Sequence, residues 1–148
     1  MQKLGKFLQL SDFDRMLLLE AALCLGIARL SLVMFRFRRI APHLGIHMAE
    51  SSEMVKLDCK DFVKQISWAL QTASRHLPWK CRCLAQAIAG KMMFKRRGIG
   101  STIYFGVAKD DKENLMAHAW LRCGDLVVTG ERDMNQFSVV STFAEEDA

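Results

Sequence analysis

The sequence lacks an apolar stretch that is both long enough to cross a membrane and free of charge. Its most apolar segment, from Met16 to Phe37, is interrupted by Glu20, Arg29 and Arg36. A membrane-spanning helix needs about 20 predominantly apolar residues with few or no charges. We therefore expect a buried or interfacial helix in this segment, with membrane association as the less favoured alternative.

A targeting segment and a disulfide pattern are also missing. We find no signal peptide, the number of cysteines is odd at five, and no spacing between them repeats. A small secreted scaffold usually carries an even set of cysteines. These observations favour reduced thiols and a cytoplasmic location.

Nucleic-acid binding has little support despite a net charge of +5. Aromatic and basic side chains alternate only briefly, over residues 35–38. A modest positive charge alone is no nucleic-acid signature. The chain of 148 residues has no internal repeat, and 51% of its residues are hydrophobic and 25% charged. The sequence therefore predicts one globular domain over residues 1–148.

Helical spacing of apolar residues and clear stop signals predict three helices. Ser11 is a candidate cap for the first helix, Pro42 and Pro78 break the chain, and Gly98 follows the third helix. The expected helices run over residues 14–35, from Ser51 or Ser52 to about residue 75, and from residues 81–84 to 97. We expect residues 1–45 to form an N-terminal helical part.

The last third of the chain is typical of β-structure. β-branched and aromatic residues gather in short runs, and Gly124-Asp125 is a hairpin signal. The expected strands are residues 101–108, 115–123, 126–129 and 136–143. Helices followed by an antiparallel sheet define an α+β domain.

The start of the third helix carries two candidate nucleophiles, Cys81 and Cys83. The positive end of the helix dipole favours thiolate over thiol, and Lys80 and Arg82 add positive charge nearby. The two cysteines are two positions apart and cannot share a helix face. We favour Cys83, because the buried-type run of the helix begins directly after it.

A matching base is His118, which lies inside an apolar, strand-like run. A lone histidine of this kind is more often a core residue satisfied by a backbone carbonyl, but here a helix-start cysteine precedes it. A two-residue turn at Gly124-Asp125 would place Glu131 opposite His118 on one face of the hairpin, where it could orient the imidazole. Asp133 becomes reachable if the hairpin is bulged, and Asp125 ranks third.

Two other readings of the same residues stay open. Cys81, Cys83, Cys123 and His118 could form a metal or redox site, although zinc ligands usually follow a Cys-x2-4-Cys spacing that Cys81-x-Cys83 does not meet. A peptide-binding scaffold with a degenerate triad is the second alternative, because the acid is uncertain. We predict no cofactor and no metal.

The pattern resembles the lasso-peptide leader peptidase family, the transglutaminase-like, C-terminal half of the lasso-peptide B protein. The matching motifs are Met16-Leu-Leu-Leu-Glu-Ala-Ala22, Cys83-Leu-Ala-Gln-Ala, Lys95-Arg-Arg-Gly-Ile, Phe105-Gly-Val and Ala117-His-Ala-Trp-Leu. The resemblance implies a papain/transglutaminase-like core, with the sheet packed on the nucleophile-bearing helix and a catalytic core over residues 78–143. It implies Cys83 as nucleophile and His118 as base. Members often carry an aspartate near the end of the next strand, where this chain reads Thr129-Gly130-Glu131.

The same resemblance implies a function and partners. The chain would be a cysteine peptidase that cuts the leader from a lasso-peptide precursor, freeing the core amine for a separate cyclase. Fused members carry an N-terminal peptide-recognition domain, so a separate leader-recognition protein is expected as partner here. A different acyl transfer at the same site, such as transamidation, is the nearest rival, because fold and triad do not separate hydrolysis from aminolysis.

Overall fold

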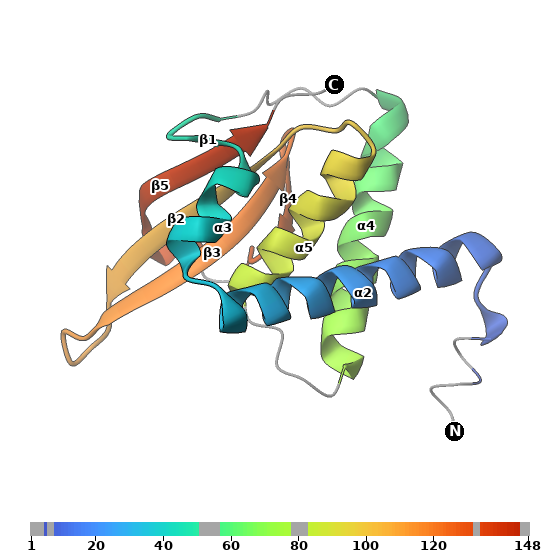
Figure 1. Cartoon of the computed structure of the whole chain (residues 1–148), viewed down its shortest axis with the longest axis horizontal. Helices are drawn as coiled ribbons and strands as arrows, with labels where there is room; N and C mark the ends of the chain where they lie inside the picture. Colours follow the sequence, from blue (N-terminus) through green and yellow to red (C-terminus); the bar gives the residue numbers. More distant parts are fainter. Residues whose placement is uncertain (1–4, 6–7, 51–56, 78–82, 132–133, 146–148) are drawn as a thin grey trace.

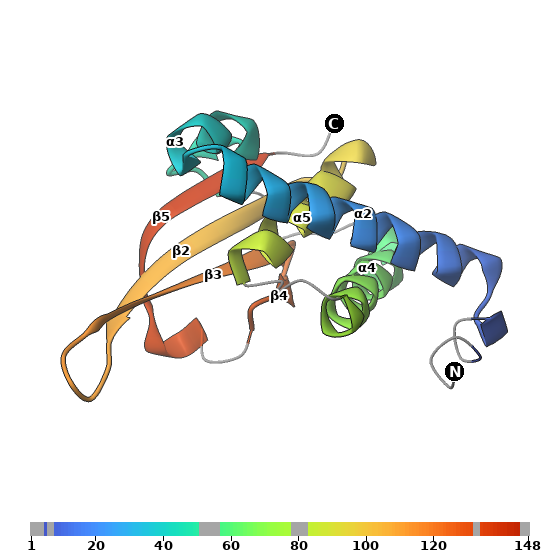
Figure 2. The same cartoon turned by 60° about the horizontal axis from the view of Figure 1, so that its bottom comes forward.

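Helices cover one face of a five-stranded antiparallel sheet. The computed structural model describes residues 5, 8–50, 57–77, 83–131 and 134–145 (Figure 1). The strand order is β1-β5-β2-β3-β4, and every neighbouring pair is antiparallel. Figure 2 shows the long helices together on one side of this sheet. The predicted α+β class is confirmed.

Three long helices form the helical layer. They are α2 (Asp12–Met34), α4 (Leu57–His76) and α5 (Cys83–Arg96), and the short α3 (Phe37–Ile40) and the 3-10 turn η1 (Ala41–Leu44) follow α2. The Ser11 hydroxyl accepts a hydrogen bond from the Asp14 backbone N–H at 3.1 Å, which confirms the predicted cap. The predicted start of the second helix at Ser51 or Ser52 lies outside the described residues.

The predicted strands are all present, with ends within about two residues of those expected. They are β2 (Ser101–Lys109), β3 (Leu115–Cys123), β4 (Leu126–Thr129) and β5 (Ser138–Glu145), with the 3-10 turn η2 (Met134–Gln136) before β5. The two-residue strand β1 (Ile46–His47) lies between the first and second predicted helices, where no strand was expected. It pairs with β5 and has no periodic pattern of its own, so no sequence signal marks it.

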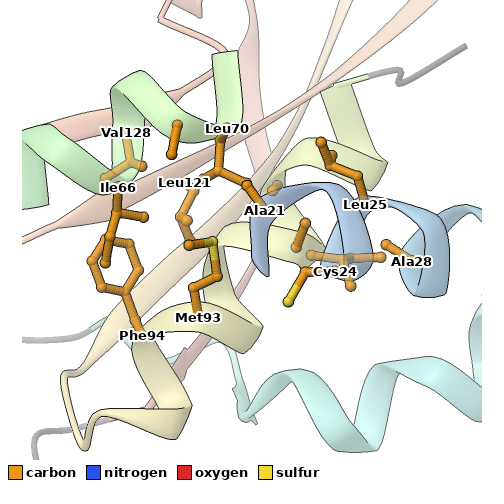
Figure 3. Packing of buried hydrophobic residues seen from close by; sticks show 14 of the residues in the cluster. Ala21, Cys24, Leu25, Ala28, Ile66, Leu70, Met93, Phe94, Leu121 and Val128 are labelled. Atoms are coloured by element: carbon orange, nitrogen blue, oxygen red, sulfur yellow. The ribbon is translucent and has the colours of Figure 1, made fainter. Parts of the chain in front are cut away.

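The hydrophobic core fills the space between the helices and the sheet. Figure 3 shows side chains from α2, α4, α5, β3 and β4 meeting there. Among the fully buried residues are Leu25 of α2, Ile66 and Leu70 of α4, Met93 and Phe94 of α5, Leu121 of β3 and Val128 of β4. Burial of side chains of this size stabilises the fold by about 1.5–3 kcal/mol each.

The contact between α5 and the sheet is close and fixed at two points. A Cβ atom built on Gly90 would lie 2.5 Å from Cδ2 of Leu121, so only glycine allows α5 to approach β3 this closely. The Lys91 side chain is 2% exposed, and its Nζ donates a hydrogen bond to the Ser101 carbonyl at 2.8 Å. These contacts hold α5 against the sheet.

Helix α2 is tied to the end of α5 by a shared carboxylate. Glu20 Oε2 lies 2.5 Å from Arg97 Nη2, and Glu20 Oε1 lies 2.8 Å from Arg96 Nη1. The hydrogen bond from Arg97 is the main cause that holds the pKa of Glu20 below its ordinary value of 4.5, against the opposing effect of burial. The Arg97 guanidinium also lies over the Phe62 ring, 5.2 Å from its centroid.

Helix α5 and strand β3 run in the same direction, which places their first halves side by side. Near their ends, Cys123 Sγ lies 3.4 Å from the Gly100 carbonyl that follows α5, and Gly90 faces Leu121 further back. From that contact, seven residues of helix lead back about 10 Å to Cys83, and three residues of strand lead back about 10 Å to His118. The two candidate catalytic residues therefore lie at about the same distance from this contact, each along its own element.

Candidate active site

Cys83 is the first residue of α5 and is half-buried. The first N–H groups of a helix have no partner within the helix, and the dipole adds partial positive charge at this end. Nucleophilic cysteines are often found at such helix starts. The predicted neighbours Lys80, Cys81 and Arg82 lie outside the described residues.

His118 lies in β3, opposite Gly106 of β2. Its half-buried ring is flanked by two aromatic rings, with centroids 5.7 Å away for Trp120 and 5.0 Å away for Phe137. A Cβ on Gly106 would lie 2.8 Å from Phe137 Cβ and 2.9 Å from Cζ3 of Trp120. The glycine thus makes room for the rings that hold the imidazole.

One hydrogen bond fixes the orientation of the imidazole. His118 Nε2 and the Gly130 carbonyl oxygen are 2.7 Å apart. A carbonyl oxygen can only accept, so Nε2 carries the proton and donates it to this bond. In the neutral ring Nδ1 is then the acceptor, free to take a proton. This is the tautomer that a general base at Nδ1 requires.

Gly130 occupies a backbone conformation that other residues rarely adopt. Its φ is +74°, in the left-handed region. A Cβ built there would lie 2.5 Å from the Ala119 carbonyl oxygen and 2.8 Å from Trp120 Cβ. The carbonyl that orients His118 is therefore set by a position that only glycine fills without strain.

The predicted pairing of His118 with Glu131 is wrong, because the hairpin is bulged. Cys123 pairs with Leu126 as expected, but Leu121 pairs with Thr129, where the regular hairpin would have Trp120. The extra residue on β4 shifts the register by one position beyond Arg122. Glu131 therefore does not face His118 on the same side of the hairpin.

No described carboxylate contacts the His118 ring. Glu131 is exposed and forms no hydrogen bond or ion pair with His118, and Asp125 lies at the turn, 3.7 Å from Lys60 Nζ. Asp133, which the sequence favoured in the case of a bulge, lies outside the described residues. The observed partner of Nε2 is a backbone carbonyl, the arrangement that the sequence allowed for a core histidine.

The structure places Cys83 and His118 on opposite sides of β3 and not in a hydrogen bond. Strand β3 pairs with β2 without a register shift, so its side chains alternate regularly between the two faces. Leu121 faces α5, and His118, three positions away, lies on the opposite face with Trp120. Between these two described residues no hydrogen bond is formed.

The metal-site alternative has no support in the described part of the chain. No three His, Cys, Asp or Glu side chains gather there in a way that could hold an ion. Cys123 is a free thiol, 1% exposed, and alternation places it on the face of β3 opposite His118. Cys24 is also buried, and burial raises the pKa of its thiol, which makes it a poor nucleophile.

Sequence reasoning missed three residues that shape the surroundings of His118: Gly106, Gly130 and Phe137. An isolated glycine in or directly after a strand is a signal for a bulge or a close backbone approach. Thr129-Gly130-Glu131 carries this signal at the end of β4. Phe137 carries none, because its contact with His118 depends on the path of the chain between β4 and β5.

Comparison with known proteins places the chain in a family. The model of the transglutaminase-like superfamily matches residues 28–142, which include Cys83, His118 and Gly130. No curated protein and no solved structure matches the chain. Members usually carry a Cys-His-Asp triad and include cysteine peptidases and acyltransferases. The match covers most of the sequence, and this protein belongs to the transglutaminase-like superfamily.

Proposed function

We propose that this protein is a cysteine peptidase that removes the leader from a lasso-peptide precursor, with Cys83 as nucleophile and His118 as base. The observation that carries the proposal is the hydrogen bond from His118 Nε2 to Gly130, which leaves Nδ1 as the proton acceptor. The second observation is the position of Cys83 at the start of α5, where a nucleophilic cysteine is expected. Membership in a superfamily of cysteine peptidases and acyltransferases supports this chemistry.

The reaction follows from these two groups. The Cys83 thiol gives its proton to His118 Nδ1, and the thiolate attacks the carbonyl carbon of the peptide bond between leader and core. The C–N bond then breaks, and Nδ1–H protonates the leaving core amine. Water, deprotonated by Nδ1, attacks the thioester and releases the leader carboxylate with the free thiol. The developing oxyanion would be bound by backbone N–H groups at the start of α5.

In this proposal the Gly130 carbonyl takes the orienting role that a triad acid has elsewhere. It accepts a hydrogen bond from Nε2–H in both charge states of the ring. The reaction needs more than a side-chain rotation, because the two side chains lie on different sides of β3. The start of α5 or the strand itself must move to bring the Cys83 thiol to Nδ1. Catalytic hydrogen bonds often form only in the substrate complex.

The proposed partners follow from the lasso-peptide assignment. The substrate is the leader region of the precursor peptide, which a separate leader-recognition protein presents. A separate cyclase consumes the freed core amine. We propose a cytoplasmic location for these steps.

A peptide-binding scaffold is the second candidate function. Two observations among the described residues favour it: Cys83 and His118 form no hydrogen bond, and no carboxylate contacts the His118 ring. Transamidation is a third outcome at the same site, and it differs from hydrolysis only in the acyl acceptor.

A cleavage assay separates these functions. Wild type, Cys83→Ala and the control Cys24→Ala are each mixed with the precursor and the leader-recognition protein, and products are weighed by mass spectrometry. We expect leader and free core from wild type and Cys24→Ala, and intact precursor from Cys83→Ala. Intact precursor in all three, with the complex formed, would favour the scaffold. A leader joined to an added amine would indicate transamidation.

A further inference from the structure

The outward face of α2 carries a long apolar stripe that is exposed along most of its length, although Phe13 at its first end also lies near the Phe62 ring of α4. We call it the outer stripe, and its seven members are between 43% and 69% exposed. They are Phe13, Met16, Leu19, Leu23, Ile27, Leu30 and Val33. The spacing of three or four residues places them along one side of the helix. Figure 2 shows α2 lying across the outside of α4 and α5.

The outer stripe is distinct from the face that α2 uses in the core. Leu17, Ala21, Cys24, Leu25 and Ala28 are buried on the inward face. α2 is long and apolar enough to cross a membrane, with a mean hydropathy of 2.0 over its most apolar 18 residues, of which 33% are buried. Spanning a membrane would pull this inward face out of the core. The outer stripe therefore needs a partner that binds α2 where it lies.

The area of the outer stripe matches one side of a protein interface. With roughly 150–200 Å² for each fully free side chain, its members expose on the order of 700 Å² together. The largest apolar patch of a typical monomer is about 300–600 Å². A stable interface buries about 800 Å² on each partner.

The spacing of the outer stripe is symmetric about Leu23. In an antiparallel pair of α2 helices centred there, Leu23 meets Leu23 of the second copy and Leu19 meets its Ile27. Met16 then meets Leu30, and Phe13 meets Val33, so every member faces another member. A two-fold axis requires a self-complementary surface, whereas binding to a partner of unrelated sequence requires none.

The charges at the two ends of α2 also favour an antiparallel pair. Asp12 and Asp14 lie in its first turn, and the exposed Arg36 and Arg38 follow its last turn. Antiparallel pairing brings the acids of one copy to the arginines of the other, and the two helix dipoles oppose each other. An anionic membrane would attract one end and repel the other.

We propose that a second copy of this chain covers the outer stripe, forming an antiparallel α2–α2 homodimer with Leu23 at the two-fold axis. The interface is built from the face of α2 that points away from α5 and its Cys83 end. The dimer is independent of the peptidase proposal, because it uses none of the catalytic side chains.

Sedimentation equilibrium over about 1–100 µM tests the dimer directly. The wild-type chain should reach twice its mass of 16.8 kDa. Leu23→Glu should raise the dimer Kd by about 30-fold or more, since it places two charges at the centre of the interface. The matched control Leu115→Glu replaces a leucine that is 71% exposed at the start of β3, and it should dimerise as wild type does. Circular dichroism verifies that both variants fold.

Cysteine cross-linking tests the antiparallel arrangement. Under mild oxidation Leu23→Cys should form a covalent dimer, and so should Met16→Cys mixed with Leu30→Cys. Met16→Cys alone should stay uncrosslinked, because its counterpart lies at the other end of the pair. Cross-linking of Met16→Cys alone would overturn the antiparallel arrangement.

Two outcomes would overturn the homodimer itself. One is a wild-type chain that stays monomeric up to about 100 µM. The other is a monomer that floats with phosphatidylserine vesicles through Leu23, which would assign the outer stripe to a membrane surface. Cys83→Ala should leave the dimer unchanged, so loss of peptidase activity and loss of dimerisation are separable.

Discussion

The two faces of strand β3 make different kinds of contact. On the face toward α5, Leu121 and Cys123 are buried in the core. On the other face, His118, Trp120 and Arg122 make polar and aromatic contacts with Gly130, Tyr104 and Phe137. The core face depends on regular alternation and close packing. The His118 face depends on two irregular features, the hairpin bulge and the left-handed Gly130. Changes on the first face should therefore affect stability, and changes on the second should affect activity.

The largest expected effect lies on the His118 face. His118→Asn removes the proton acceptor at Nδ1, so the cleavage rate should fall on the order of 10³-fold. The free energy of unfolding should change by less than about 1 kcal/mol, because the ring is only half-buried. The measurements are single-turnover cleavage and urea unfolding. A variant that cleaves at the wild-type rate would remove His118 from the mechanism.

On the core face, replacement of Leu121 should disrupt the packing most directly. Leu121→Ala should lower the free energy of unfolding by about 2–5 kcal/mol, because it leaves a cavity against Gly90 and Leu70. The double variant Leu121→Ala/Gly90→Ala should recover part of this loss, since the new methyl group of residue 90 fills the space that Leu121 leaves. Urea unfolding of the single and double variants measures both effects. If the stability losses of the two single changes simply added in the double variant, the close contact between residues 90 and 121 would be contradicted.

Gly130 connects the backbone irregularity to the imidazole. Gly130→Ala places a methyl group against the Ala119 carbonyl, so the Gly130 carbonyl should shift and kcat should fall about 10- to 100-fold with little change in KM. Glu131→Gln should stay within about three-fold of wild type, because Glu131 does not contact the ring. The reverse result, a large loss for Glu131→Gln and none for Gly130→Ala, would restore Glu131 as the orienting acid.

The smallest expected effect lies away from both faces, at the Glu20 ion pair. Glu20→Gln should destabilise the fold by about 1–2 kcal/mol at pH 7. Arg97 holds the pKa of Glu20 below its unfolded value. The stabilisation by Glu20 is therefore fully present when the pH is above the unfolded-state pKa. It is lost as the pH falls through the lower folded-state pKa. Urea unfolding from about pH 6 to pH 3 should show a shallower loss of stability for Glu20→Gln than for wild type.

Much of the fold was predictable, because it follows from local patterns. The Ser11 cap, the apolar spacing of α2 and α5, and the Gly124-Asp125 turn all act over a few residues, and the structure confirms each. The bulge on β4 was considered only as an alternative, because the residue pattern from Leu126 to Thr129 is the same for a regular strand and for a bulged one. A single inserted residue moved Glu131 out of register with His118.

The surroundings of His118 were also hard to predict, because they depend on contacts that leave no pattern in the sequence. Its partner is a backbone carbonyl, which leaves no mark of its own in the side-chain sequence. Phe137 reaches the ring from the start of the last strand, so its role depends on tertiary packing. The departure at Thr129-Gly130-Glu131 from the aspartate of related sequences was visible, and the structure shows that its glycine contacts the histidine through its carbonyl.

The central claim is that His118 activates Cys83 in the substrate complex, and the rate of Cys83 alkylation at a fixed neutral pH, measured with the leader peptide and the leader-recognition protein bound, tests it. Trypsin cuts after Lys80, Arg82 and Lys91, so the peptide 83–91 carries Cys83 as its single cysteine. Iodoacetamide labelling of this peptide is followed by mass spectrometry for wild type, His118→Asn and the control His47→Asn.

The account predicts that Cys83 in wild type and in His47→Asn is alkylated at least about 10-fold faster than in His118→Asn, because His118 takes the thiol proton in this complex. Equal rates for all three proteins would show that His118 does not reach Cys83, and the peptidase mechanism would be contradicted.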